Sequence, residues 1–134
     1  VKWVTEDRVV LAMNNRGLDA DKFWFSLFHE IKHVLQQKIK TVFISSTVEE
    51  MKDFNNNLEI EADRFAMDYL ISPKDYEKLN PTKYTSDNEI KEFAKKIGIH
   101  PGIVAGRLQH EGIIAQNRCT KLKEKYVIKI QHIA

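Results

Sequence analysis

The sequence predicts an α+β fold organised as a single domain. Three observations support this prediction: two short β-rich runs, two long segments with helical periodicity, and a pair of shorter helices after residue 86. The chain has 134 residues, of which 43% are hydrophobic and 30% charged, so a packed core is expected and disorder is not. We expect the core over residues 1–86 and a helical subdomain with a tail over residues 87–134.

The first expected strand covers residues 7–13, and a turn follows at residues 14–17. A strand so near the start needs a neighbour, which is expected upstream of Val1. The chain does not begin with Met, so either a Met has been removed or the chain is a fragment of a longer protein. The strand's missing neighbour favours the fragment.

Two long helices are expected next. Residues 19–37 carry apolar side chains at three- and four-residue spacing, with Asp19 or Asp21 as N-cap. The second helix covers residues 58–71 and is stopped by Ser72 and Pro73. Between them we expect a second β-rich run at residues 41–45 and a polar loop at residues 47–57.

Shorter elements complete the chain. Residues 74–79 predict a turn of helix, and residues 80–88 a loop. Residues 89–97 predict a helix between an Asp87 N-cap and a Gly98 C-cap, and residues 101–111 another. The alternation within residues 121–130 predicts a terminal strand.

The pattern His-Glu-x-x-His stands inside the first long helix. Residues four apart lie on one face of a helix, so His29 and His33 can converge on one metal ion. Glu30 can reach a water on that ion, accept its proton and later deliver it to a leaving amine. The bulky residues before the motif predict burial of this helix on more than one side, where two His and a Glu need a partner such as a metal.

The second long helix offers the third ligand. Glu59 and Glu61 compete, and residues two apart point to different sides of a helix. Glu59 shares its face with small alanines that permit close approach, so Glu59 is preferred and Glu61 is expected to contact solvent or a loop. Asp63, one turn after Glu59, can orient a ligand His by accepting a hydrogen bond from its other ring nitrogen. Zn²⁺ is the expected metal, with Mn²⁺ or another divalent ion as alternatives.

These residues resemble the ImmA/IrrE family of metallopeptidases. The resemblance rests on residues 28–35, 59–66 and 70–73, and extends more weakly over residues 3–114. The family pattern places its ligand Glu where Glu59 stands and an Asn or Asp where Asp63 stands. Residues 93–109 resemble the C-terminal part of antitoxin-type regulators, in which a helix-turn-helix domain of the Xre type precedes this domain. The resemblance implies a zincin-like fold, with a small antiparallel sheet packed on the His-Glu-x-x-His helix and on a second ligand-bearing helix.

The resemblance implies a cytoplasmic zinc metalloendopeptidase whose catalytic core is residues 1–86. Its protein substrate would be a transcriptional repressor or regulator. The alternative is an effector domain without enzyme activity, which binds a metal or a partner within an antitoxin-type regulator. In that case an N-terminal helix-turn-helix domain would belong to the full-length protein.

Other features receive simpler interpretations. The net charge of +2 gives no reason to expect nucleic acid, and residues 89–111, although spaced like a helix-turn-helix, contain one arginine, Arg107, on the helix that would read DNA. His100 and His110 are expected to be capping or surface residues. The single cysteine, Cys119, is expected to be a free thiol in a reducing compartment. We find no signal peptide and no apolar run near the ~20 residues that span a bilayer.

Overall fold

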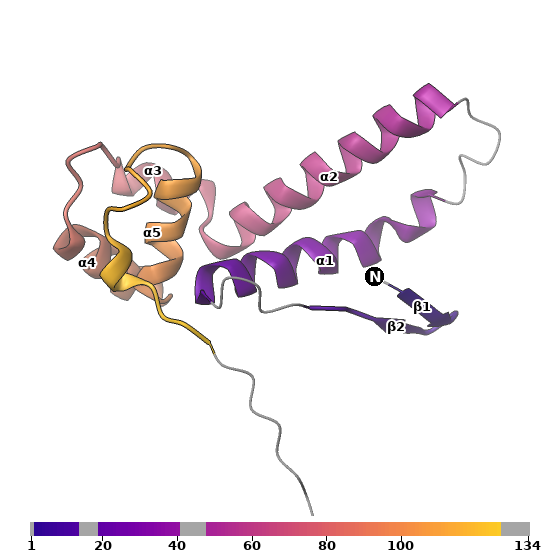
Figure 1. Cartoon of the computed structure of the whole chain (residues 1–134), viewed down its shortest axis with the longest axis horizontal. Helices are drawn as coiled ribbons and strands as arrows, with labels where there is room; N and C mark the ends of the chain where they lie inside the picture. Colours follow the sequence, from indigo (N-terminus) through magenta and orange to yellow (C-terminus); the bar gives the residue numbers. More distant parts are fainter. Residues whose placement is uncertain (1, 14–18, 41–47, 127–134) are drawn as a thin grey trace, which may run out of the picture. The chain divides into compact units, whose positions relative to one another are not determined.

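The computed structural model describes residues 2–13, 19–40 and 48–126, with the backbone alone for residues 37–40. Five helices and a two-stranded antiparallel sheet form this part of the chain, in agreement with the predicted α+β class (Figure 1). Contacts group the chain into two compact units, one of residues 1–13 and 25–69 and one of residues 14–24 and 70–134. This grouping differs from the division expected after residue 86, which stays a prediction about domains. In order, the elements are β1 (Lys2–Thr5), β2 (Arg8–Val10), α1 (Ala20–Lys40), α2 (Val48–Leu70), α3 (Pro73–Leu79), α4 (Asp87–Ile97), α5 (Pro101–His110) and the 3-10 turn η2 (Thr120–Leu122).

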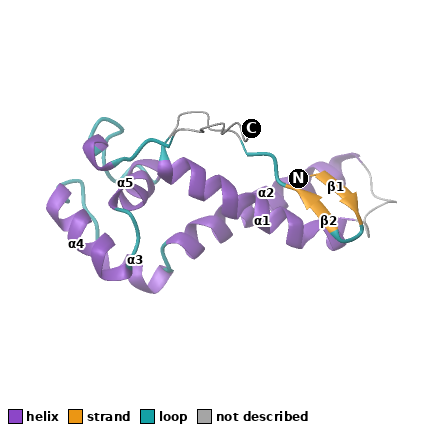
Figure 2. Cartoon of the chain, turned by 90° about the horizontal axis from the view of Figure 1, so that it is seen from below, coloured by secondary structure: helices purple, strands orange, loops and turns teal. Residues whose placement is uncertain are grey.

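The strands of the described residues form a single hairpin (Figure 2). β1 pairs antiparallel with β2, with Trp3 opposite Val9, and the Thr5 hydroxyl donates to the Asp7 carboxylate at 2.7 Å beside the turn. The described part of the chain thus supplies a neighbour for this strand, where one was expected upstream of Val1. The partner is a run of four residues, too short to stand out as a strand. The packing of this sheet on α1 stays a prediction, and residues 41–45 lie outside the described residues.

α2 begins ten residues before its predicted start, so the loop expected over residues 47–57 was wrong from Val48 onward. Glu49 and Glu50 lie in its first turn, where acidic side chains complement the helix dipole. Met51, Phe54 and the buried Leu58 continue an apolar spacing of three and four into the predicted segment. The other side chains of this stretch are exposed, and their polarity is what suggested a loop.

α1 and α2 run antiparallel beside each other within the first unit (Figure 1). Ala62 and Ala66 of α2 have no exposed surface. Among the side chains that the structure describes on these two helices within the unit, every larger one keeps some exposed surface. Because a methyl group needs little room, alanines at a helix interface let the two backbones approach closely. Because the two helices lie close together, side chains on both flanks of α2 can reach α1.

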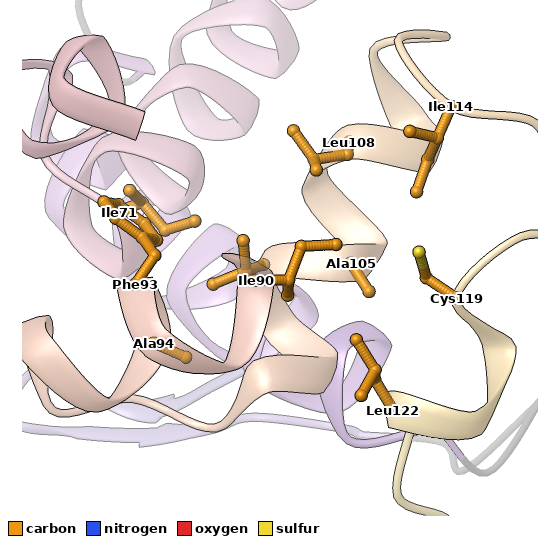
Figure 3. Packing of buried hydrophobic residues seen from close by; sticks show 10 residues of the cluster. Ile71, Ile90, Phe93, Ala94, Ala105, Leu108, Ile114, Cys119 and Leu122 are labelled. Atoms are coloured by element: carbon orange, nitrogen blue, oxygen red, sulfur yellow. The ribbon is translucent and has the colours of Figure 1, made fainter. Parts of the chain in front are cut away.

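The second unit has its own apolar core, to which α4, α5 and η2 all contribute (Figure 3). Ser86 caps α4 by accepting from the backbone N–H of Glu89 at 3.2 Å, so the expected Asp87 cap was one residue late. Gly98 ends α4 with a φ of 77°, as predicted for a C-cap. The largest nearly fully buried side chains are Ile71, Ile90, Val104 and Leu108.

α5 is buried along most of its length, from Gly102 to Gly106 and at Leu108 and Gln109. Arg107 pairs with Glu111 at 2.7 Å and lies over the ring of Tyr76. A helix that reads DNA must present a face to the major groove, and this one is packed inside the unit. Of the strand expected at residues 121–130, the described part holds the turn η2 and an isolated bridge between Asp19 and Lys125.

Candidate metal centre

Three side chains from the two long helices meet at one point of the first unit. The Nε2 atoms of His29 and His33, both on α1, are 3.0 Å apart. The two carboxylate oxygens of Glu59, on α2, lie 3.0 Å from these nitrogens, one oxygen to each. Among the residues that the structure describes, these three form the group of His, Cys, Asp and Glu side chains close enough to hold a metal ion.

His29 is oriented by a carboxylate. Its Nδ1 lies 2.7 Å from Oδ1 of Asp63, one helical turn after Glu59 on α2. A carboxylate accepts hydrogen bonds, so the neutral ring donates its Nδ1–H and keeps the lone pair of Nε2 for a metal. The structure thus brings Asp63 to the position that the sequence suggested for it.

His33 is oriented by a residue that the sequence reasoning missed. Its Nδ1 lies 2.9 Å from Oε1 of Gln36, and the amide nitrogen of Gln36 donates to the backbone oxygen of Leu58 and to Glu61. Gln36 is 3% exposed, the one polar side chain of the first unit that is buried among the described residues. Its position three residues after His33 puts it on the same side of α1, which is the signal that could have found it.

Glu61 is exposed to solvent, as expected, but it also contacts α1. It accepts from the Gln36 amide at 3.0 Å and pairs with Lys32 at 3.3 Å. These two contacts, first the hydrogen bond from Gln36 and then that from Lys32, lower the pKa of its carboxyl group. Glu59 and Glu61 therefore both contact α1, on opposite flanks of the buried alanines.

The donor set fits a divalent metal. In a tetrahedral zinc site, ligand atoms lie about 3.3 Å apart, close to the 3.0 Å seen here. With both rings donating through Nδ1, the atoms that meet are two nitrogen lone pairs and a carboxylate, all of them acceptors. A cation is the partner that satisfies three acceptors at once. The mixture of imidazole and carboxylate suits zinc and related ions.

The burial of the site is uneven. The imidazole side chains of His29 and His33 are 16% and 20% exposed, whereas the Glu59 side chain is 59% exposed. The expected burial of α1 on more than one side is partial, since its residues from Phe23 to Val34 are mostly half-buried. Glu30 is also half-buried, on the turn of α1 between the two histidines. Of the three side chains that meet, Glu59 is therefore the one most open to solvent.

The other histidines considered from the sequence lie in the second unit. His100 caps α5: its Nδ1 accepts from the backbone N–H of Gly102 at 2.9 Å, and its Nε2 lies 3.2 Å from Glu124. His110 is an exposed residue at the end of α5. The structure thus gives His100 the capping role that was expected for it.

Comparison with known families agrees with this geometry. A family model described as the IrrE N-terminal-like domain, Peptidase M78, matches residues 3–109, which contain every residue of the centre. No curated protein and no solved structure matches the chain significantly. Within the described residues, no helix is long and apolar enough to cross a membrane. The resemblance seen in the sequence is confirmed, and the chain belongs to the ImmA/IrrE family of metallopeptidase-type domains.

Proposed function

We propose that this chain is a zinc-dependent endopeptidase that cleaves a protein substrate. The observation that carries the proposal is the meeting of three acceptors, His29 Nε2, His33 Nε2 and the Glu59 carboxylate, in a domain of a peptidase family. Mn²⁺ or another divalent ion would suit the same donors.

The roles of the residues follow from their chemistry. His29, His33 and Glu59 hold the metal, and Asp63 fixes the ring of His29. Zinc held by these residues would supply a Lewis acid, which can lower the pKa of a water to about 7 and polarise a peptide carbonyl. Glu30, beside the first ligand, accepts the proton of the attacking water and delivers it to the leaving amine. Its half-buried position lets it act on a substrate that enters from the exposed side at Glu59.

We propose a transcriptional repressor or regulator as the substrate, and the cytoplasm as the site of action. This part of the proposal rests on the resemblance of residues 93–109 to antitoxin-type regulators. In such proteins an N-terminal helix-turn-helix domain accompanies the metallopeptidase-type domain, and it would bring the peptidase to regulators of transcription.

The test compares the wild type with Glu30→Gln, which keeps the shape of the side chain and removes its basicity. Each zinc-loaded protein is incubated with a peptide library made from a digested proteome, and new N-termini are identified by mass spectrometry. Asp53→Asn, on the exposed start of α2, serves as the matched control.

We expect cleavage by the wild type and by Asp53→Asn, and a loss of roughly 100-fold or more in Glu30→Gln, which should still bind one zinc. Cleavage at the wild-type rate by Glu30→Gln would overturn the role of Glu30. A wild type that binds zinc and cuts nothing, including candidate repressors, would overturn the enzyme proposal and favour the effector domain.

A further inference from the structure

Gln36 is a buried polar side chain with three partners. It lies on α1 with 3% of its surface exposed, and it contacts His33 on its own helix and two residues of α2. Buried amides must satisfy both their oxygen and their NH₂ group, so the partners determine which way the amide faces.

Two of these partners can only accept hydrogen bonds. The backbone oxygen of Leu58 lies 3.1 Å from the amide nitrogen of Gln36, and a carboxylate oxygen of Glu61 lies 3.0 Å from it. Each takes one of the two amide hydrogens, so the NH₂ group must face α2. The amide oxygen is then the atom 2.9 Å from Nδ1 of His33.

An amide oxygen accepts but does not donate. The hydrogen bond therefore requires that Nδ1 of His33 carry the proton, which leaves a lone pair on Nε2. That Nε2 is the atom 3.0 Å from Glu59 and from His29. Neutral imidazole in water favours the opposite tautomer, with its proton on Nε2, and this form cannot bind a metal through Nε2.

We propose that Gln36 is a positioning residue that holds His33 in the Nδ1–H tautomer and fixes the place of Glu59 relative to it, an inference that rests on the proposed metal site. The second half of this role comes from Leu58, which directly precedes Glu59 in α2. The Gln36 amide therefore links the ring of His33 to the backbone beside Glu59 through two hydrogen bonds.

The two histidines are held in different ways. His29 donates to the carboxylate of Asp63, whereas His33 donates to a neutral amide whose own orientation depends on Glu61. Glu61 thus helps to orient the Gln36 amide, and through it His33, without offering an oxygen to the metal. This arrangement makes His29 an internal control for any change made at Gln36.

The tautomer is measured directly by the ¹⁵N chemical shifts of the two imidazoles in the metal-free protein, which also distinguish a neutral ring from one that carries both protons. We expect Nδ1–H for both rings in the wild type. In Gln36→Leu, His33 should shift toward the Nε2–H tautomer while His29 does not, and the zinc Kd, measured by competition with a chelator, should rise roughly 10- to 100-fold.

A swapped pair gives a rescue. In Gln36→Glu/Glu61→Gln the carboxylate on α1 accepts from His33 and from the amide on α2, while the hydrogen bond to the backbone oxygen of Leu58 is lost. We expect this pair to keep the Nδ1–H tautomer of His33, and it also tests the proposal if Gln36→Leu does not fold.

Nε2–H on His33 in the wild type would overturn the proposal. An unchanged tautomer and zinc Kd in Gln36→Leu would also do so, as would loss of the Nδ1–H tautomer in the folded swapped pair. The tautomer is read without metal and without substrate. If the chain cleaves nothing, the tautomer measurement can therefore still support the inference about Gln36. If the chain is an active peptidase but the His33 tautomer is the same with and without Gln36, the inference fails and the proposed function stands.

Discussion

Oδ1 of Asp63 lies 2.7 Å from Nδ1 of His29, so a carboxylate on α2 accepts a hydrogen bond from an imidazole on α1. The partner is charged, and a charged acceptor makes the opposite ring nitrogen a stronger donor to a metal.

Asp63→Ala is expected to raise the zinc Kd roughly 10- to 100-fold, and Asp63→Asn to raise it less, because an amide oxygen can still accept from His29. Chelator competition measures both values, with Asp53→Asn as the control on the same helix. Equal affinity in Asp63→Ala and the wild type would show that the contact does not matter for the metal.

Glu59 and Glu61 are expected to differ in how their loss affects zinc binding. Elemental analysis should find about one zinc per chain in the wild type and in Glu61→Ala, and little in Glu59→Ala or His33→Ala, because a two-ligand remnant binds weakly. Glu61→Ala should bind less tightly than the wild type, since the Gln36 amide loses an acceptor. Zinc kept in Glu59→Ala and lost in Glu61→Ala would reverse the ligand assignment.

Ala62 has no exposed surface and stands between Glu59 and Asp63 on α2, so a larger side chain there should push the helices apart. We expect Ala62→Leu to lower the free energy of unfolding by about 1–3 kcal/mol and to weaken zinc binding. Urea denaturation and chelator competition measure the two effects. Ile60→Leu, at an exposed position of the same helix, should leave both near the wild-type values.

The thiol of Cys119 should react slowly with alkylating reagents in the folded protein. The sequence around it is polar, but the structure buries the side chain in the core of the second unit. Burial, and then the nearby Asp87 carboxylate, raise the pKa of this thiol to about 11, so little of it is thiolate near neutral pH. Alkylation by iodoacetamide at about pH 8 should be roughly tenfold or more slower in the folded protein than in guanidinium. Equal rates would show that the thiol is accessible in the fold.

The meeting of His29, His33 and Glu59 could be predicted because its rules are local. Four-residue spacing places His29 and His33 on one face of a helix, and the same rule places Asp63 one turn after Glu59. That the two faces meet follows from the small side chains of Ala62 and Ala66, which share a face with Glu59 and Asp63. The resemblance to a family pattern supplied the same Glu independently.

What could not be predicted depends on the partner helix. Glu61 points away from Glu59 on its own helix, but a long side chain can still reach a neighbouring helix from the other flank of a narrow interface. Gln36 looks like any polar residue of a helix until the position of Leu58 opposite it is known. The early part of α2 was missed for a different reason, because a solvent-exposed helix has few apolar residues to mark its period.

The bond between Gln36 and Glu61 joins residues 25 positions apart. Closing a loop of that length costs entropy on the order of 3 kcal/mol, and this cost grows only with the logarithm of the length. The contacts between α1 and α2 at Gln36 and at the buried Ala62 and Ala66 use none of the proposed ligand atoms, so helix pairing can meet this cost without a metal. A metal ion that arrives afterwards has little chain left to order, so its capture should be limited by shedding its own water rather than by assembly of the two helices.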